Sequence, residues 1–123
     1  MSGRRDEGQA TVELALVLPV VAMLVLAIVQ FTVVGHAEVV TVHAAREGAR
    51  AAAVGGSDAD VRAAVLRQSG LPGGRVQVSI TRSADAVAVE VRYVQATDIA
   101  LVGPLVGDVA HVAAATMRRE DIE

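Results

Sequence analysis

The sequence predicts an α+β protein, in which a long N-terminal transmembrane helix extends into a small outer domain with a second helix and a three-stranded antiparallel sheet. Three observations predict this class. The 22 residues Leu14–Gly35 carry no charge, and an Ala-rich stretch without proline follows them. Beyond residue 75 the apolar residues change from helical spacing to alternation. With 123 residues, the chain has room for one small domain beside the apolar segment.

The composition excludes several classes of function. All 11 basic residues are Arg and the formal net charge is −3, so we expect no nucleic-acid partner. Cysteine is absent, and no phosphate loop, zinc-protease motif or serine-hydrolase motif occurs. His43 and Glu47, one helical turn apart, supply only half of a metal site. We therefore predict that the protein is not an enzyme and has no catalytic residues, cofactor or metal.

The apolar segment is long enough to cross a membrane once. As a helix, Leu14–Gly35 spans about 33 Å, against about 30 Å of bilayer hydrocarbon. It shows no polar stripe before Gln30, and the rest of the chain is too small to bury such a helix on all sides. We predict a transmembrane helix over residues 9–35 that contacts the lipid bilayer.

The flanking charges predict the orientation. Arg4 and Arg5 precede the segment, and the next basic residue is Arg46. The positive-inside rule counts Arg and gives acids little weight, so we expect a cytoplasmic N-terminus and an outer C-terminal domain. An ordinary secretory signal is not predicted, because Glu13 stands at the start of the apolar run and no clear cleavage site follows it.

The residues around the start of the apolar run form a more specific pattern. Gly8 is followed by Gln9 and, five residues after the Gly, by Glu13 at the edge of the helix. This pattern resembles a type IV prepilin signal, which a prepilin peptidase cuts on the cytoplasmic side after the Gly. The resemblance implies processing between Gly8 and Gln9, loss of a cytoplasmic leader over residues 1–8, and a type IV pilin-like fold.

Two longer segments narrow the resemblance. GQATVELALVLP at residues 8–19 and AAREGARAAA at residues 44–53 resemble the TadE-like family of pseudopilins, or minor pilins, of the Tad/Flp pilus. Residues 115–118 match more weakly. The resemblance implies a structural or assembly-initiating subunit in the cytoplasmic (inner) membrane or the pilus. Its partners would be prepilin peptidase, other pilins or pseudopilins, and the inner-membrane assembly platform.

The residues also allow a second function. A single-pass, membrane-anchored binding module that is neither processed nor polymerised would have the same helix and outer domain. Processing at Gly8 and dependence on Glu13 distinguish the two. A major Flp-type pilin is much shorter, so the outer domain favours a minor, low-copy role.

Two residues of the membrane segment have predicted roles. A carboxylate at Glu13 is favoured near a helix N-terminus but is costly at the apolar boundary unless it is paired. The α-amine that cleavage would create at Gln9, in the same or a neighbouring subunit, is a plausible partner. The resemblance implies that Glu13 sets subunit registry. In the alternative interpretation, Glu13 only extends its carboxylate to the membrane–water interface. Pro19 removes one hydrogen bond and predicts a helix kink, although proline is also common in membrane helices.

The helix is expected to continue outside the membrane over residues 36–54, with His36 at the interface, and to end at Gly55–Gly56. Small residues recur there at four-residue spacing, which permits close helix packing. We favour packing on the chain's own domain over a contact between subunits, although both are compatible. The predicted helix-packing residues are Ala44, Ala45, Gly48, Ala49 and Ala52.

The outer domain is assigned to residues 55–123. A helix is predicted from Asp58 to about Ser69, with a capping box of Ser57 and Asp60. Its packed face is predicted to consist of Val61, Ala64, Val65 and Gln68.

Two alternating segments predict a hairpin in which Val78 faces Val89 and Val76 faces Val91. This register leaves a four-residue connection over residues 82–85. The apolar segment 95–108 is expected to be a loop that lies against another surface. Residues 109–117 form the third predicted strand, with His111 in a structural role.

Overall fold

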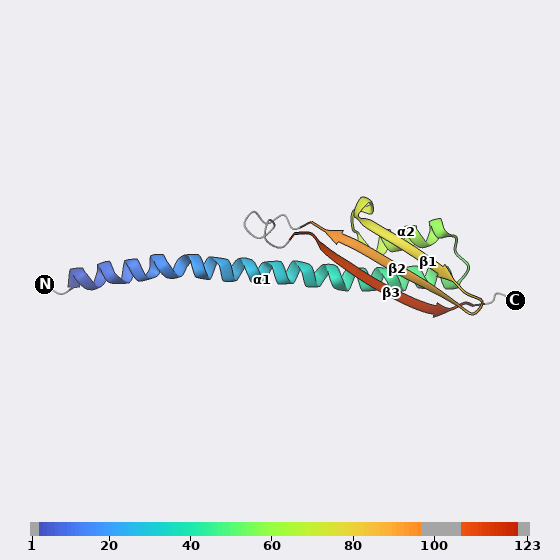
Figure 1. Cartoon of the computed structure of the whole chain (residues 1–123), viewed down its shortest axis with the longest axis horizontal. Helices are drawn as coiled ribbons and strands as arrows, with labels where there is room; N and C mark the ends of the chain where they lie inside the picture. The colour runs from blue at the N-terminus through green and yellow to red at the C-terminus, as the bar shows by residue number, and fades with distance from the viewer. Residues whose placement is uncertain (1–2, 97–106, 121–123) are drawn as a thin grey trace. The chain divides into compact units, whose positions relative to one another are not determined.

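The computed structural model describes residues 3–96 and 107–120, and it divides into two compact units, Met1–Val34 and Gly35–Glu123. The predicted fold class is confirmed, since a long apolar helix is followed by a second helix and a three-stranded antiparallel sheet (Figure 1). The elements are α1 (Gly3–Ala53), α2 (Asp58–Ser69), a short 3-10 turn (Gly73–Arg75), β1 (Val76–Arg82), β2 (Ala86–Gln95) and β3 (Val109–Arg118).

The first unit consists of the N-terminal part of α1. Its apolar side chains are exposed around the helix, from Val12 to Val33, with only Leu26, Gln30 and Val34 half-buried among the described residues. A helix that is apolar on all sides needs an apolar environment. Among residues 3–96 and 107–120, this is the one helix long and apolar enough to cross a membrane.

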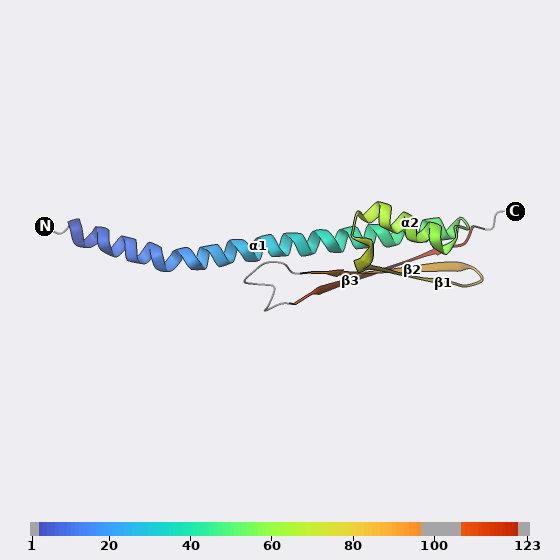
Figure 2. The same ribbon diagram turned by 90° about the horizontal axis from the view of Figure 1, so that it is seen from above.

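The second unit is built around the C-terminal part of α1. Figure 2 shows the sheet nearly edge-on, with this part of α1 and α2 on one side of it. Ala and Val dominate the core between these layers, so the elements approach closely. The core residues are Ala37, Ala44, Ala45, Ala49, Ala52, Ala53, Val61, Val65, Val76, Val87, Val89, Val91, Tyr93 and Ala113.

Gly48 marks a close approach between elements of this unit. A Cβ atom at this position would lie 2.7 Å from Cγ2 of Val65 and 3.1 Å from Cγ1 of Val89. Both valines are fully buried. Glycine therefore lets α1 lie against α2 and β2 at once.

The bounds of α2 agree with the prediction, because its ends are specified locally. The Ser57 hydroxyl accepts a hydrogen bond from the Asp60 amide at 3.2 Å, and the Asp60 carboxylate accepts one from the Ser57 amide at 3.0 Å. Gly70 ends the helix with φ 61°, a conformation that favours glycine.

The predicted packed face of α2 is wrong at one position. Val61, Ala64 and Val65 are buried, but Gln68 is exposed. Leu66 packs against the core instead. An apolar side chain gains from this contact, whereas an amide would lose its hydration.

The predicted hairpin exists, but its register is wrong by two residues. Val78 faces Val91 rather than Val89, and Val76 faces Tyr93 rather than Val91. The alternation of buried and exposed residues survives, because a shift of two keeps every side chain on its face.

The turn explains the shift. The Ser83 amide donates to the Ala86 carbonyl at 2.8 Å, and the Ser83 hydroxyl accepts from the Ala86 amide at 3.2 Å. These hydrogen bonds close the connection after Arg82 and bring Tyr93 into the ladder.

The third strand is confirmed as β3, which pairs with β2 along its length. The predicted packing of the loop at 95–108 lies outside the described residues over 97–106. Gln95 is the last residue of β2 rather than the start of a loop.

Candidate functional site

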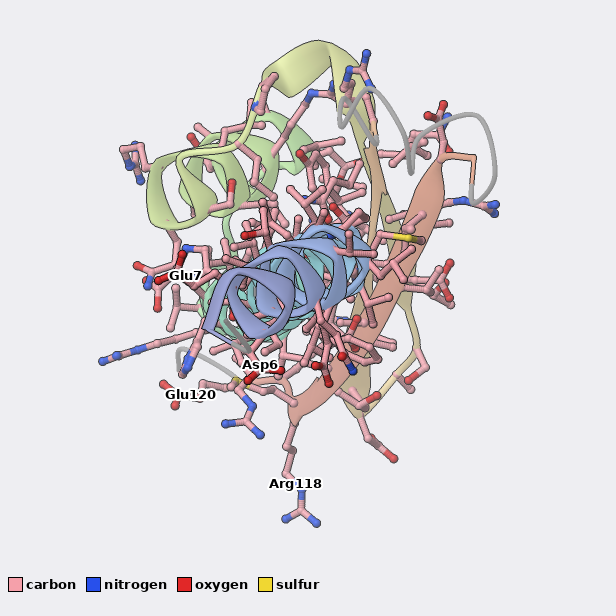
Figure 3. All side chains as sticks on the ribbon, turned by 90° about the vertical axis from the view of Figure 1, so that its left-hand side faces the viewer. Asp6, Glu7, Arg118 and Glu120 are labelled. Carbon is pink, nitrogen blue, oxygen red and sulfur yellow. The ribbon has the colours of Figure 1, made fainter. Side chains whose placement is uncertain are left out.

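The residues around the predicted cleavage position lie within α1. Gly8 and Gln9 are exposed, and nothing lies within 4 Å of a Cβ placed on Gly8. Asp6 and Glu7 lie at the same end of the helix (Figure 3). Cutting between Gly8 and Gln9 requires local unwinding, because a protease must reach the backbone and the helix holds that backbone in its own hydrogen bonds. Glycine lowers the cost of unwinding by about 1 kcal/mol relative to Ala.

Glu13 lies one turn beyond Gln9. It lines a shallow surface pocket with Ala10, Leu14 and Val17, which share its face of the helix. Its carboxylate makes no ion pair or hydrogen bond with any residue of 3–96 or 107–120. Glu13 is thus an exposed acid on an apolar helix face with no partner in the described part of its own chain.

Pro19 lies inside α1, and the helix continues through it. Because proline has no amide hydrogen, the carbonyl of Ala15, four residues earlier, loses its helical donor. The position therefore has one fewer backbone hydrogen bond than the rest of the helix.

The predicted helix-packing residues all lie in the second unit. Ala44, Ala45 and Ala49 are at most 1% exposed, and Ala52 is 4% exposed. Gly48 is also buried. They contact the chain's own α2 and sheet core, so within this structure they are packed inside the domain.

A polar cluster around the buried His111 was not foreseen from the sequence. Nδ1 of His111 lies 2.8 Å from Oε2 of Glu38, and Nε2 lies 3.1 Å from Oε1 of Gln95. The imidazole is 3% exposed and stacks on Tyr93, with ring centroids 6.1 Å apart. The cluster joins α1, β2 and β3. Its partners are 73 and 16 residues from His111 along the chain, so no local pattern could have indicated them.

The other histidines remain separate from this cluster. His36 and His43 are exposed on α1, and Glu47 is half-buried. Within the described ranges, no three His, Asp or Glu side chains gather as a metal site would require.

An exposed ion pair connects β1 with α2. Arg82 at the end of β1 pairs with Asp58 at the start of α2, and it also donates to the Gly56 carbonyl at 3.0 Å. Nearby, hydrogen bonds from the Ser57 side chain and backbone lower the pKa of Asp60. These contacts stabilise the start of α2.

Comparison with known proteins identifies one part of the chain. Residues 8–50 match the family model of TadE-like proteins, and this range lies entirely within α1. No curated protein and no solved structure matches the chain. The match confirms the resemblance seen in the sequence over the segment that contains Gly8, Glu13 and Gly48. Residues 8–50, which make up most of the long helix, are therefore similar to TadE-like proteins.

Proposed function

We propose that the protein is a minor pilin or pseudopilin of a Tad/Flp-type pilus, a non-enzymatic structural or assembly-initiating subunit. The observation that carries the proposal is the position of Glu13. It is an unpaired carboxylate on an exposed apolar helix, five residues after Gly8, inside the segment that matches the TadE-like family.

The proposal assigns the chain to the cytoplasmic (inner) membrane. Residues 9–35 span the bilayer with the N-terminus in the cytoplasm. Residues 36–54 continue the helix outside, and residues 55–123 complete the outer domain. The exposed apolar side chains of α1 support this assignment, because water would hydrate them unfavourably.

Processing after Gly8 by a prepilin peptidase would change the electrostatics around Glu13. In the full chain Glu13 lies in the third turn of α1. Removal of residues 1–8 would make Gln9 the first residue and place Glu13 one turn from a new helix N-terminus. The first four amides there would lose their acceptors, and the helix end carries about half a positive charge.

The same cut would alter a local hydrogen bond. The Thr11 hydroxyl donates to the Glu7 carbonyl at 2.9 Å. Glu7 leaves with the leader, so the Thr11 hydroxyl becomes available to another acceptor. Cleavage would therefore create donors and a new amine beside Glu13 in one step.

We propose that Glu13 uses these groups for subunit registry. An acid at the centre of a membrane helix costs about 2.5–3.5 kcal/mol on insertion scales, so a carboxylate at the boundary gains from a cationic partner. The amine of Gln9, in the same or a neighbouring subunit, is that partner. Other pilins or pseudopilins and the inner-membrane assembly platform are the proposed binding partners.

The test of processing is the intact mass of the protein purified from its native membrane. A chain that begins at Gln9 supports the proposal. A chain that still begins at Met1 or Ser2 favours an unprocessed, single-pass binding module. Gly8→Ala should block cutting, and because a Cβ there meets no atom within 4 Å, the fold should not change.

A second test addresses registry. Glu13→Gln should leave membrane insertion intact and reduce pilus assembly and co-purification of partner subunits. The substitution removes the charge and keeps the size of the side chain. Normal piliation in this variant would contradict the registry role.

A further inference from the structure

We infer that Gln9, once it is the N-terminal residue, is a modification site at which the chain cyclises to a pyroglutamyl lactam, in competition with the ion pair to Glu13. The inference rests on the proposed processing after Gly8. It concerns the fate of the new amine, which the registry role of Glu13 leaves open.

The groups that would react belong to one residue. Gln9 is exposed, and its carboxamide makes no hydrogen bond with any residue in the described ranges. A free side chain of this length can fold back so that its Cδ meets the α-nitrogen in a five-membered ring. No contact in the described structure has to break for this to happen.

The step balances without an oxidant, a reductant or a cofactor. The lone pair of the α-amine attacks the carboxamide Cδ, and a new C–N bond forms. The bond from Cδ to the side-chain nitrogen breaks, a proton moves from the amine to that nitrogen, and ammonia leaves. An α-amine has a pKa of about 7.7–8.0, so an appreciable fraction is neutral and nucleophilic near pH 7.

The lactam is compatible with the start of a helix. A ring that includes the backbone nitrogen is tolerated at the first helical position, as proline is, because the group on that nitrogen has no helical partner there. Cyclisation would therefore leave α1 intact beyond Gln9.

Glu13 would oppose the reaction. Cβ atoms tilt toward the N-terminus of a helix, so a carboxylate at Glu13 leans toward the turn that begins at Gln9. A nearby negative charge favours the ammonium form, which is not a nucleophile. A chain whose α-amine is paired with a Glu13 carboxylate should keep that amine, and a chain without this ion pair should lose it.

Cyclisation changes the charge of the segment that enters the membrane. Processing removes Arg4 and Arg5, and the next Arg is Arg46. The α-amine is then the one remaining cation of the N-terminal end, apart from any protonated histidine. The lactam retains an N–H donor but no charge, so Glu13 would have to replace an ion pair with a hydrogen bond.

The experiment follows the intact mass of the full-length chain after co-expression with a prepilin peptidase and purification in detergent, over several days at neutral pH. We expect the chain that begins at Gln9 to lose the mass of one ammonia molecule with time. Glu13→Gln should accelerate the loss, by about tenfold for each pKa unit by which the carboxylate stabilised the ammonium.

Gln9→Met is the matched control. It keeps an unbranched side chain of similar length and removes the carboxamide, so no ammonia can leave from this residue. A processed wild-type chain that stays open, or a loss that also occurs in Gln9→Met, overturns the inference while the proposed function stands. Equal rates in wild type and Glu13→Gln overturn the competition with Glu13. A chain that still begins at Met1 or Ser2 overturns the proposed processing and, with it, the inference.

Discussion

Substitution of Gly48 by Ala tests the close contact at the centre of the second unit. The added Cβ would lie 2.7 Å from Val65 and 3.1 Å from Val89, and both valines are fully buried, so they have little room to move. Overpacking of this kind costs about 1–3 kcal/mol. Ala is a better helix former than Gly by about 0.5–1 kcal/mol. We therefore expect Gly48→Ala to lower the free energy of unfolding by about 1 kcal/mol, with an upper end near 2.5 kcal/mol.

Gly35→Ala is the matched control, because Gly35 lies in the same helix and a Cβ there meets nothing within 4 Å. It should raise the free energy of unfolding by about 0.5–1 kcal/mol. The difference between the two variants isolates the contact, about 1–3 kcal/mol.

The assay uses the protein's own probe. Tyr93 is the one tyrosine in a chain without tryptophan, and it is buried in the core. Its fluorescence during urea unfolding of the full chain in detergent micelles reports on the second unit. If Gly48→Ala and Gly35→Ala change the stability equally, the close approach of α1 to Val65 and Val89 is refuted.

Two further predictions concern polar contacts of the outer domain. Glu38→Ala removes the acceptor of the buried His111 ring and should lower the free energy of unfolding by about 1–2 kcal/mol in the same assay. Glu90→Ala, an exposed control on β2, should change it by no more than about 0.5 kcal/mol. Equal effects of the two substitutions would show that the His111 cluster does not stabilise the fold. The lowered pKa of Asp60 predicts that its capping contribution is complete above the usual carboxyl range and is lost as the pH falls through the lowered value. Urea unfolding between pH 6 and pH 3 should show this loss as a decrease of the free energy of unfolding with falling pH. Ser57→Ala should make this pH dependence weaker, because the hydrogen bonds of Ser57 lower the pKa of Asp60. An unchanged pH dependence in the variant would contradict this assignment.

The helices could be predicted because their signals are local. The capping residues Ser57 and Asp60 lie three positions apart, and Gly70 follows the last turn of α2. The small residues of α1 likewise repeat within one helix, so their common face was visible in the sequence. The TadE-like segment was identified from the same helix.

The errors arise where the alternation of apolar residues does not decide the structure. Valines alternate along both strands, so two registers bury them equally well, and hydrogen bonds of Ser83 choose between them. The partners of His111, which lies on β3, come from α1 and β2 and show no pattern in sequence. Of the candidate site, the residue types at Gly8 and Glu13 were evident, and their functional roles stay predictions.

The contribution of α1 to the second unit has a consequence for fragments of the chain. Residues 37–53 of α1 supply six of the 14 core residues of this unit. A soluble fragment that begins after Gly55 should therefore fail to fold, whereas one that begins near Gly35 retains the core.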